Sequence, residues 1–109
     1  MAYTVVEALE EKKGEDILLL DLHEIAPFAD YFVLCSGTSD RMLDSLANAA
    51  LEKVRETHGL KGRVEGVARS GWILVDFGDV ILHIFAPEVR DYYRLEELWA
   101  EGKVLLHLQ

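Results

Sequence analysis

The sequence predicts a single domain of the α/β (α+β) class, in which a mixed five-stranded sheet packs with about three helices. Helix-like and strand-like segments alternate along the chain, half of the residues are hydrophobic, and glycine and proline are sparse. A chain of 109 residues has room for one hydrophobic core. We therefore expect residues 1–109 to form one domain, without a linker or an internal repeat.

The first third of the chain has the pattern of a helix followed by two strands. Residues 3–13 place apolar side chains among Glu and Lys at helical spacing, and Gly14 follows as a stop signal. Residues 16–22 form a short apolar run, which predicts a strand before the turn-prone segment 26–30. Residues 31–36 are rich in aromatic and branched side chains, so they predict a second strand.

The centre of the chain predicts the longest helix and a third strand. Ser39 can cap the helix, Asp40 lies near the positive end of its dipole, and Gly59 follows its last turn. Apolar residues recur between these ends at helical spacing: Leu43, Leu46, Ala47, Ala50 and Val54. Residues 61–68 are expected to supply the third strand.

Residues 71–85 predict a β-hairpin, because strand-like runs flank Gly78-Asp79, a pair suited to a type II′ turn. That turn fixes the register, with Trp72 opposite Phe85. Side chains alternate between faces, so one face is wholly apolar and should be core: Ile73, Val75, Phe77, Val80, Leu82 and Ile84. The other face mixes large apolar groups with an acid and an imidazole: Trp72, Leu74, Asp76, Ile81, His83 and Phe85. Three helices cannot easily cover both faces of a sheet, so we expect part of this second face to be open.

The C-terminal part of the chain predicts one more helix. Pro87 suits a first helical position, and an apolar stripe continues from there to Trp99. Arg90 and Arg94 are expected to be solvated charges on this helix. Residues 104–108 could form a further short strand. The tail that contains them would serve either as a strand in a dimer or as a cover for the sheet.

Charge and composition restrict the partners and the compartment. The formal net charge is −9, with 20 acidic residues against 11 Lys and Arg, so the surface should repel DNA and RNA. A basic partner is expected, unless the acidity serves only solubility. Residues 1–7 have neither the basic start nor the continuous apolar run that a signal peptide would show, and no later apolar run is long enough for a membrane. The one cysteine, Cys35, lies in an apolar run. We therefore expect a cytosolic protein with a buried thiol.

No motif strongly predicts catalysis. Gly37-Thr38-Ser39 could cradle a phosphate at a helix N-terminus, but an ordinary capped helix is the simpler interpretation. No predicted strand has two carboxylates at i and i+2, which would converge on catalytic metal ions. The four histidines lie on separate elements without zinc-site spacing. We expect neither a cofactor nor a metal.

The second face of the hairpin is the candidate site. Asp76 lies diagonal to His83, and the two are expected to form a polar pair amid Trp72, Leu74 and Phe85. Apolar anchors with a few oriented polar groups are typical of protein interfaces. Aromatic residues of the last helix either extend this surface or pack in the core: Tyr92, Tyr93 and Trp99.

Three runs of the sequence, in order, are similar to one family: residues 30–39 (DYFVLCSGTS), 72–85 (WILVDFGDVILHIF) and 88–99 (EVRDYYRLEELW). They resemble the ribosomal silencing factor family, also called the Iojap or YbeB-like family, over about residues 5–99, with 100–109 as a tail. The resemblance implies a nucleotidyltransferase-like fold without catalytic carboxylates, and a translational repressor rather than an enzyme. It also implies binding to protein fourteen of the large ribosomal subunit, a steric block to small-subunit joining when nutrients are short, and homodimers when free.

The same resemblance points to a partner surface centred on Trp72. The resemblance adds Asp76, His83 and Tyr93 to this surface. The hairpin register adds Leu74 and Ile81. Two alternatives stay open at this point. One is a nucleotide-binding enzyme that uses residues 37–39, and the other is a module that only forms homodimers.

Overall fold

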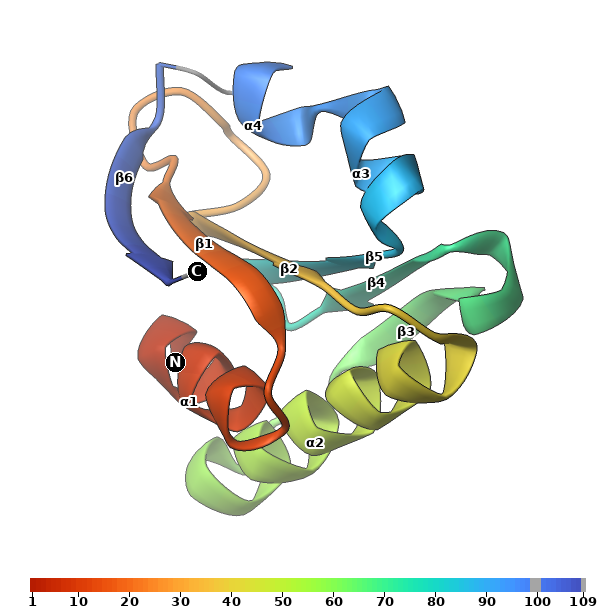
Figure 1. The fold of residues 1–109 in the computed structure, drawn as a ribbon. Coiled ribbons are helices and arrows are strands. Elements are labelled where there is room, and N and C mark those ends of the chain that lie inside the picture. The colour runs from red at the N-terminus through yellow and green to blue at the C-terminus, as the bar shows by residue number, and fades with distance from the viewer. Residues whose placement is uncertain (99–100, 109) are drawn as a thin grey trace.

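A six-stranded mixed sheet with helices on both faces forms the domain, which the computed structural model describes over residues 1–98 and 101–108 (Figure 1). The strand order is β3-β4-β5-β2-β1-β6, in which β2 and β5 are parallel and the other pairs antiparallel. The strands are β1 (Glu15–Asp21), β2 (Tyr31–Ser36), β3 (Arg63–Val67), β4 (Trp72–Asp76), β5 (Val80–Phe85) and β6 (Lys103–Leu108). The helices are α1 (Ala2–Glu11), α2 (Asp40–His58), the 3-10 turn η1 (Ala68–Ser70), α3 (Pro87–Tyr93) and α4 (Leu95–Leu98). The predicted α+β class is confirmed.

Each face of the sheet has its own hydrophobic cluster. α1 and α2 pack side by side on one face and close the larger cluster against it (Figure 1). On the other face, α3, α4 and the segment 22–30 lie over a smaller cluster that includes Phe32, Leu34, Ile81 and Phe85. In the part of the chain that the structure describes, no helix has the length and apolar character needed to cross a membrane.

The sixth strand departs from the predicted sheet. β6 pairs antiparallel with β1, with Leu106 opposite Leu19 and Lys103 opposite Asp21. The tail therefore extends the chain's own sheet at the β1 edge, and the predicted count of five strands was one short. The apolar pattern of the tail indicated a strand, but a single strand's pattern does not reveal which sheet edge it will join.

The hairpin forms with the predicted register. The pairs are those that the turn predicts, from Trp72 opposite Phe85 to Asp76 opposite Ile81. Gly78 has a φ of 92°, and Asp79 is not among the residues with positive φ, as a type II′ turn requires. The predicted core face is confirmed, since each of its side chains is at most 2% exposed: Ile73, Val75, Phe77, Val80, Leu82 and Ile84.

α2 begins and ends where the sequence predicts. Ser39 has an extended backbone, with φ −145° and ψ 160°, and its Oγ accepts a hydrogen bond from the backbone N–H of Met42 at 3.1 Å. Gly59 ends the helix with a φ of 66°, a left-handed conformation that glycine adopts without a steric penalty. Because α2 closes the larger core cluster, its cap contributes to the stability of the domain.

Replacing Ser39 with Ala is expected to lower the free energy of unfolding by about 1 kcal/mol, because the N–H of Met42 loses its acceptor. Urea denaturation followed by circular dichroism measures this change. The control is Ser45→Ala in the interior of the same helix, which should change stability by less than about 0.5 kcal/mol. Equal losses in the two variants would contradict the capping role.

The last predicted helix is in fact two helices. α3 ends at Tyr93 and α4 begins at Leu95, because Arg94 between them has a left-handed φ of 47°. The prediction of one uninterrupted helix was therefore wrong, and Trp99 lies outside the described residues. Tyr92 is 80% exposed, which also rules out its assignment to the core. Arginine rarely adopts positive φ, so the sequence carries no signal for this break.

Candidate partner-binding face

The second face of the hairpin is half covered: its β5 side chains are buried, and its β4 side chains are partly exposed. We call it the Trp72 face and define it by six residues: Trp72, Leu74, Asp76, Ile81, His83 and Phe85. The three on β5 are buried, with exposed fractions of 8% for Ile81, 4% for His83 and 0% for Phe85. The three on β4 are half-buried. The chain's own segments therefore cover β5 on this face, whereas the three β4 side chains stay partly exposed to solvent.

Trp72 is the centre of an aromatic cluster that reaches solvent. The centroid of its ring lies 4.8 Å from that of Tyr93 and 5.0 Å from that of Phe85. Tyr93 is 50% exposed, and its ring lies 5.1 Å from that of the more exposed Tyr92. The structure thus places Tyr93 beside Trp72, and α3 extends the Trp72 face with two exposed aromatic rings.

A shallow pocket continues the Trp72 face towards the sheet edge. Its volume is about 290 Å³, and it is lined by Glu65, Gly66, Ser70, Trp72 and Leu74. Leu74 therefore lies at a concave part of the surface, next to Trp72. A hollow beside an aromatic side chain suits the insertion of a partner's side chain.

His83 lies at the centre of the buried half of the Trp72 face. Its Nδ1 accepts a hydrogen bond of 3.3 Å from the indole Nε1–H of Trp72. Its ring packs edge-on against Phe32, at a centroid distance of 4.7 Å, and stacks with Phe85 at 6.0 Å. Burial lowers the pKa of His83 to about 4, so the imidazole is neutral near pH 7 and its Nδ1 is free to accept.

The predicted pair between Asp76 and His83 was wrong. Oδ1 of Asp76 accepts a 2.7 Å hydrogen bond from the backbone N–H of Gly78, and Oδ2 lies 3.2 Å from Nη2 of Arg63. Asp76 therefore holds the hairpin turn and pairs with the neighbouring strand, while His83 bonds to Trp72. The diagonal spacing of the two residues allowed a contact, but nearer partners at the turn and on β3 engage the carboxylate.

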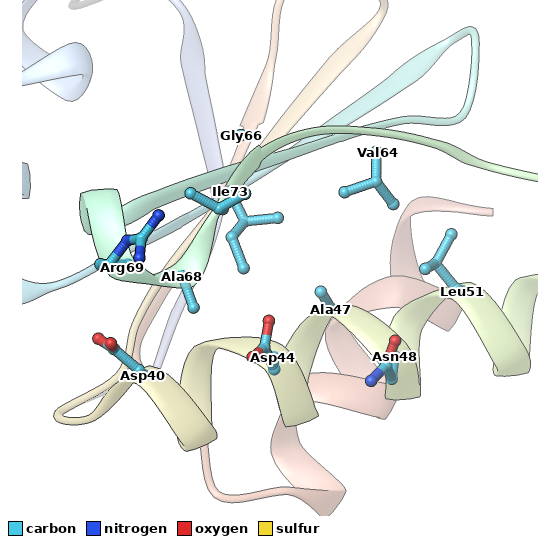
Figure 2. Close-up of a pocket in the computed structure, with 11 residues that line it drawn as sticks. Asp40, Asp44, Ala47, Asn48, Leu51, Val64, Gly66, Ala68, Arg69 and Ile73 are labelled. Carbon is cyan, nitrogen blue, oxygen red and sulfur yellow. The ribbon is translucent and has the colours of Figure 1, made fainter.

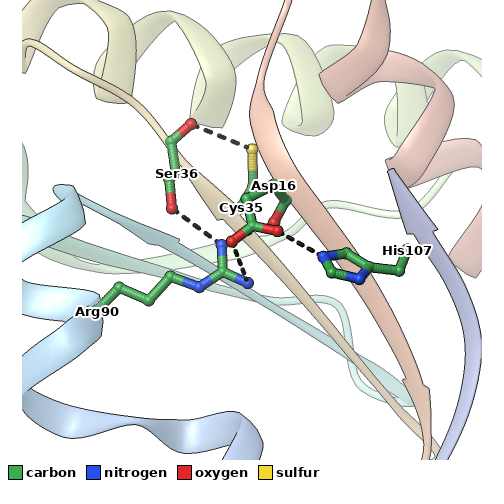
Figure 3. Close-up of polar contacts among 5 residues, drawn as sticks. All are labelled: Asp16, Cys35, Ser36, Arg90 and His107. Carbon is green, nitrogen blue, oxygen red and sulfur yellow. Dashed lines mark hydrogen bonds and ion pairs between the residues drawn. The ribbon is translucent and has the colours of Figure 1, made fainter. Parts of the chain in front are cut away.

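Arg90 attaches α3 to the sheet, and its prediction as a solvated charge was wrong (Figure 3). It is only 5% exposed, and its Nη1 donates to the backbone oxygen of Asp16 at 2.7 Å and to Oγ of Ser36 at 2.9 Å. The carboxylate of Asp16 lies 3.6 Å from Nη2 and also contacts His107 on β6. This network fixes the helix that carries Tyr93, one turn beyond Arg90.

The predicted burial of Cys35 is confirmed. Its side chain is 0% exposed and lies in the larger core cluster. Burial raises the pKa of the thiol to about 12, although the charge of Arg90 opposes part of that shift. The thiol is therefore protonated near pH 7, and it donates weakly to the backbone oxygen of Ser36.

The start of α2 favours an ordinary cap over a phosphate site. A pocket of about 400 Å³ lies between α2 and β3, and Figure 2 shows Asp40 and Asp44 on its helical wall with Arg69 on the other side. The backbone N–H groups of Gly37 and Thr38 are already hydrogen-bonded within the domain. A phosphate would therefore meet two carboxylates and no free N–H at these positions. Within residues 1–98 and 101–108, no three His, Cys, Asp or Glu side chains gather as a metal site would require.

Fold and surface together define a small α+β domain with partly exposed aromatic side chains on one face of its sheet. The chain belongs to the ribosomal silencing factor family, because the family model described as "Ribosomal silencing factor during starvation" matches residues 1–108. The match includes the C-terminal tail as well as the region 5–99, and it confirms the resemblance seen in the sequence.

Individual relatives agree with this membership. The Bacillus subtilis (strain 168) protein named "Ribosomal silencing factor RsfS" is 39% identical over 95 residues, which cover 87% of this chain and 80% of that protein. A crystal structure of a Chromobacterium violaceum protein superposes with a TM-score of 0.86 at 36% identity, covering 98% of this chain and 88% of that one. The mouse protein named "Mitochondrial assembly of ribosomal large subunit protein 1" is 33% identical over 100 residues, covering 87% of this chain and 43% of that protein.

Proposed function

We propose that this protein is a translational repressor and not an enzyme. It binds the large ribosomal subunit in the cytoplasm through ribosomal protein fourteen, blocks joining of the small subunit sterically, and lowers translation when nutrients are limited. Membership of the silencing factor family supports this proposal. The mouse relative, whose name refers to assembly of the ribosomal large subunit, supports the large subunit as the partner.

The observation that carries the proposal is the partly exposed aromatic pair of Trp72 and Tyr93. The centroids of the two rings lie 4.8 Å apart, beside the half of the Trp72 face that is buried in the smaller core cluster. Large aromatic side chains on a pre-formed surface provide contact area with little loss of conformational entropy on binding. Leu74 and Asp76 add an apolar contact and a fixed carboxylate beside them. In this proposal Ile81 and His83 support the surface from its buried half.

The charge of the chain supports a basic partner. The net charge of −9 repels the phosphates of ribosomal RNA and attracts a basic ribosomal protein. Complementary charge raises the rate of encounter and disfavours wrong sites more than it adds affinity. The protein would therefore approach a protein-rich part of the subunit surface in preference to exposed RNA.

The alternatives predict different behaviour. A nucleotide-binding enzyme would need free backbone N–H groups at residues 37–39, and those of Gly37 and Thr38 are engaged. A plain homodimer would bury Trp72 against a second copy without binding ribosomes. We propose that the free protein does form a homodimer, and that the ribosomal partner competes with the second copy.

Sedimentation of the protein with separated ribosomal subunits tests the proposal. We expect comigration with the large subunit and not with the small one, together with a loss of subunit joining and direct binding to purified ribosomal protein fourteen. Tyr93→Ala should weaken comigration by about tenfold. The matched control is Tyr3→Ala, because Tyr3 is a 60% exposed tyrosine on α1, on the opposite side of the sheet. Wild-type protein that stays at the top of the gradient at micromolar concentration would contradict the proposal.

A further inference from the structure

We propose that His83 is a positioning residue, which holds the indole of Trp72 in the orientation that contacts the partner without touching the partner itself. This inference rests on the proposed function of the Trp72 face. It changes the role of His83 from a contact residue, as the resemblance implies, to a support for one.

Burial places His83 out of reach of a partner. The side chain is 4% exposed, and its ring is held between Phe32, edge-on at 4.7 Å, and Phe85, stacked at 6.0 Å with an angle of 6° between the planes. Packing on two sides fixes the direction of the Nδ1 lone pair. His83 therefore offers a fixed acceptor to a neighbour that is more exposed.

That neighbour is Trp72. Its Nε1–H donates to Nδ1 of His83 at 3.3 Å, while its ring lies beside Tyr93. An indole on a half-open surface has more than one rotamer, and a directed hydrogen bond selects among them. The bond fixes one edge of the indole towards the interior, so the ring is held in place for a partner before binding.

The state of Nε2, the second ring nitrogen of His83, indicates that this histidine does not serve the stability of the fold alone. An Nδ1 that accepts from Trp72 leaves the proton on Nε2. Among the residues that the structure describes, Nε2 of His83 is buried and has no hydrogen-bond partner. A buried N–H without an acceptor opposes folding, so an apolar ring would fit this position at least as well for stability. The imidazole is explained by the acceptor that it offers to Trp72.

Two substitutions at His83 separate positioning from packing. His83→Asn keeps an acceptor near the place of Nδ1, and His83→Phe keeps a ring but no acceptor. We expect His83→Phe to unfold at an equal or higher urea concentration and yet to bind the large subunit about tenfold more weakly, whereas His83→Asn stays within about threefold of wild type. In NMR spectra, the indole N–H of Trp72, assigned by its loss in Trp72→Phe, should exchange faster with solvent in His83→Phe than in wild type or His83→Asn.

A double-mutant cycle completes the test, because Trp72→Phe removes the donor and leaves His83 intact. If the bond acts, the combined variant Trp72→Phe/His83→Phe loses no more binding than Trp72→Phe alone. Additive losses, or a His83→Phe variant that binds like wild type with an unchanged indole signal, would overturn the inference. Failure of wild-type protein to bind the large subunit would instead refute the proposed function, and the indole signal would still report whether His83 orients Trp72.

Discussion

Replacing Trp72 with Ala is expected to lower the affinity for the large ribosomal subunit by about 100-fold, the range of a central aromatic anchor in a protein interface. The substitution removes a partly exposed ring, against which the ring of Tyr93 lies at a centroid distance of 4.8 Å. It also opens the cluster above Phe85, whose ring is 5.0 Å from that of Trp72. Affinity is measured by cosedimentation with the large subunit, or by binding of the protein to immobilised large subunits.

A control separates this loss from a general loss of folding. Val64→Ala alters a 46% exposed apolar residue of β3, the strand next to β4, at a position where alternation places the side chain on the opposite face. It should leave binding unchanged within about twofold. The Trp72→Ala variant must retain its circular dichroism spectrum at the temperature of the assay. Wild-type affinity in a folded Trp72→Ala variant would exclude the Trp72 face as the binding surface.

Replacing Arg90 with Met is expected to lower the free energy of unfolding by about 3 kcal/mol, because buried acceptors lose their donor. Ser36 is 6% exposed, and its Oγ accepts from Arg90 at 2.9 Å, as does the backbone oxygen of Asp16 at 2.7 Å. Methionine replaces most of the volume, so the loss reflects polar contacts more than a cavity. The carboxylate of Asp16 is about half exposed, so the ion pair itself contributes little.

The control for Arg90 is the next arginine of the chain. Arg94 is 63% exposed and pairs with Glu97 at 3.5 Å, so Arg94→Met should change stability by less than about 0.5 kcal/mol. Urea denaturation of both variants provides the comparison. Because Arg90 also anchors the helix that carries Tyr93, Arg90→Met should weaken binding to the large subunit even where the variant stays folded. Equal stability losses for the two arginines would show that the Arg90 network is not needed for folding.

Much of the fold could be predicted because it follows from short-range patterns. The pair Gly78-Asp79 set the hairpin register, and alternation then identified the core face, whose side chains are at most 2% exposed. Ser39 and Gly59 marked the ends of α2 through cap chemistry that involves only near neighbours. The break at Arg94 and the place of β6 could not be predicted, because neither depends on a local residue preference.

The candidate site was predicted only in part. The sequence placed Trp72, Leu74, Asp76, Ile81 and His83 on one face, and the structure agrees. It did not show which of them a partner could reach, since the cover over β5 comes from α3 and the segment 22–30. The spacing of the residues predicted a pair between His83 and Asp76. In the structure the imidazole of His83 bonds to Trp72, and the carboxylate of Asp76 bonds to Gly78 and Arg63.

The sequence by itself determined the class of the fold, the hairpin with its two faces, and the family. Periodicity, turn residues and motifs depend on residues that are close together in the chain. Only the tertiary structure decided that β5 is covered while three β4 side chains stay partly exposed, that His83 accepts a hydrogen bond from Trp72, and that Arg90 is buried. Arg90 meets acceptors 74 and 54 positions away in the chain. The burial of a polar side chain depends on such distant partners, and no local pattern specifies them.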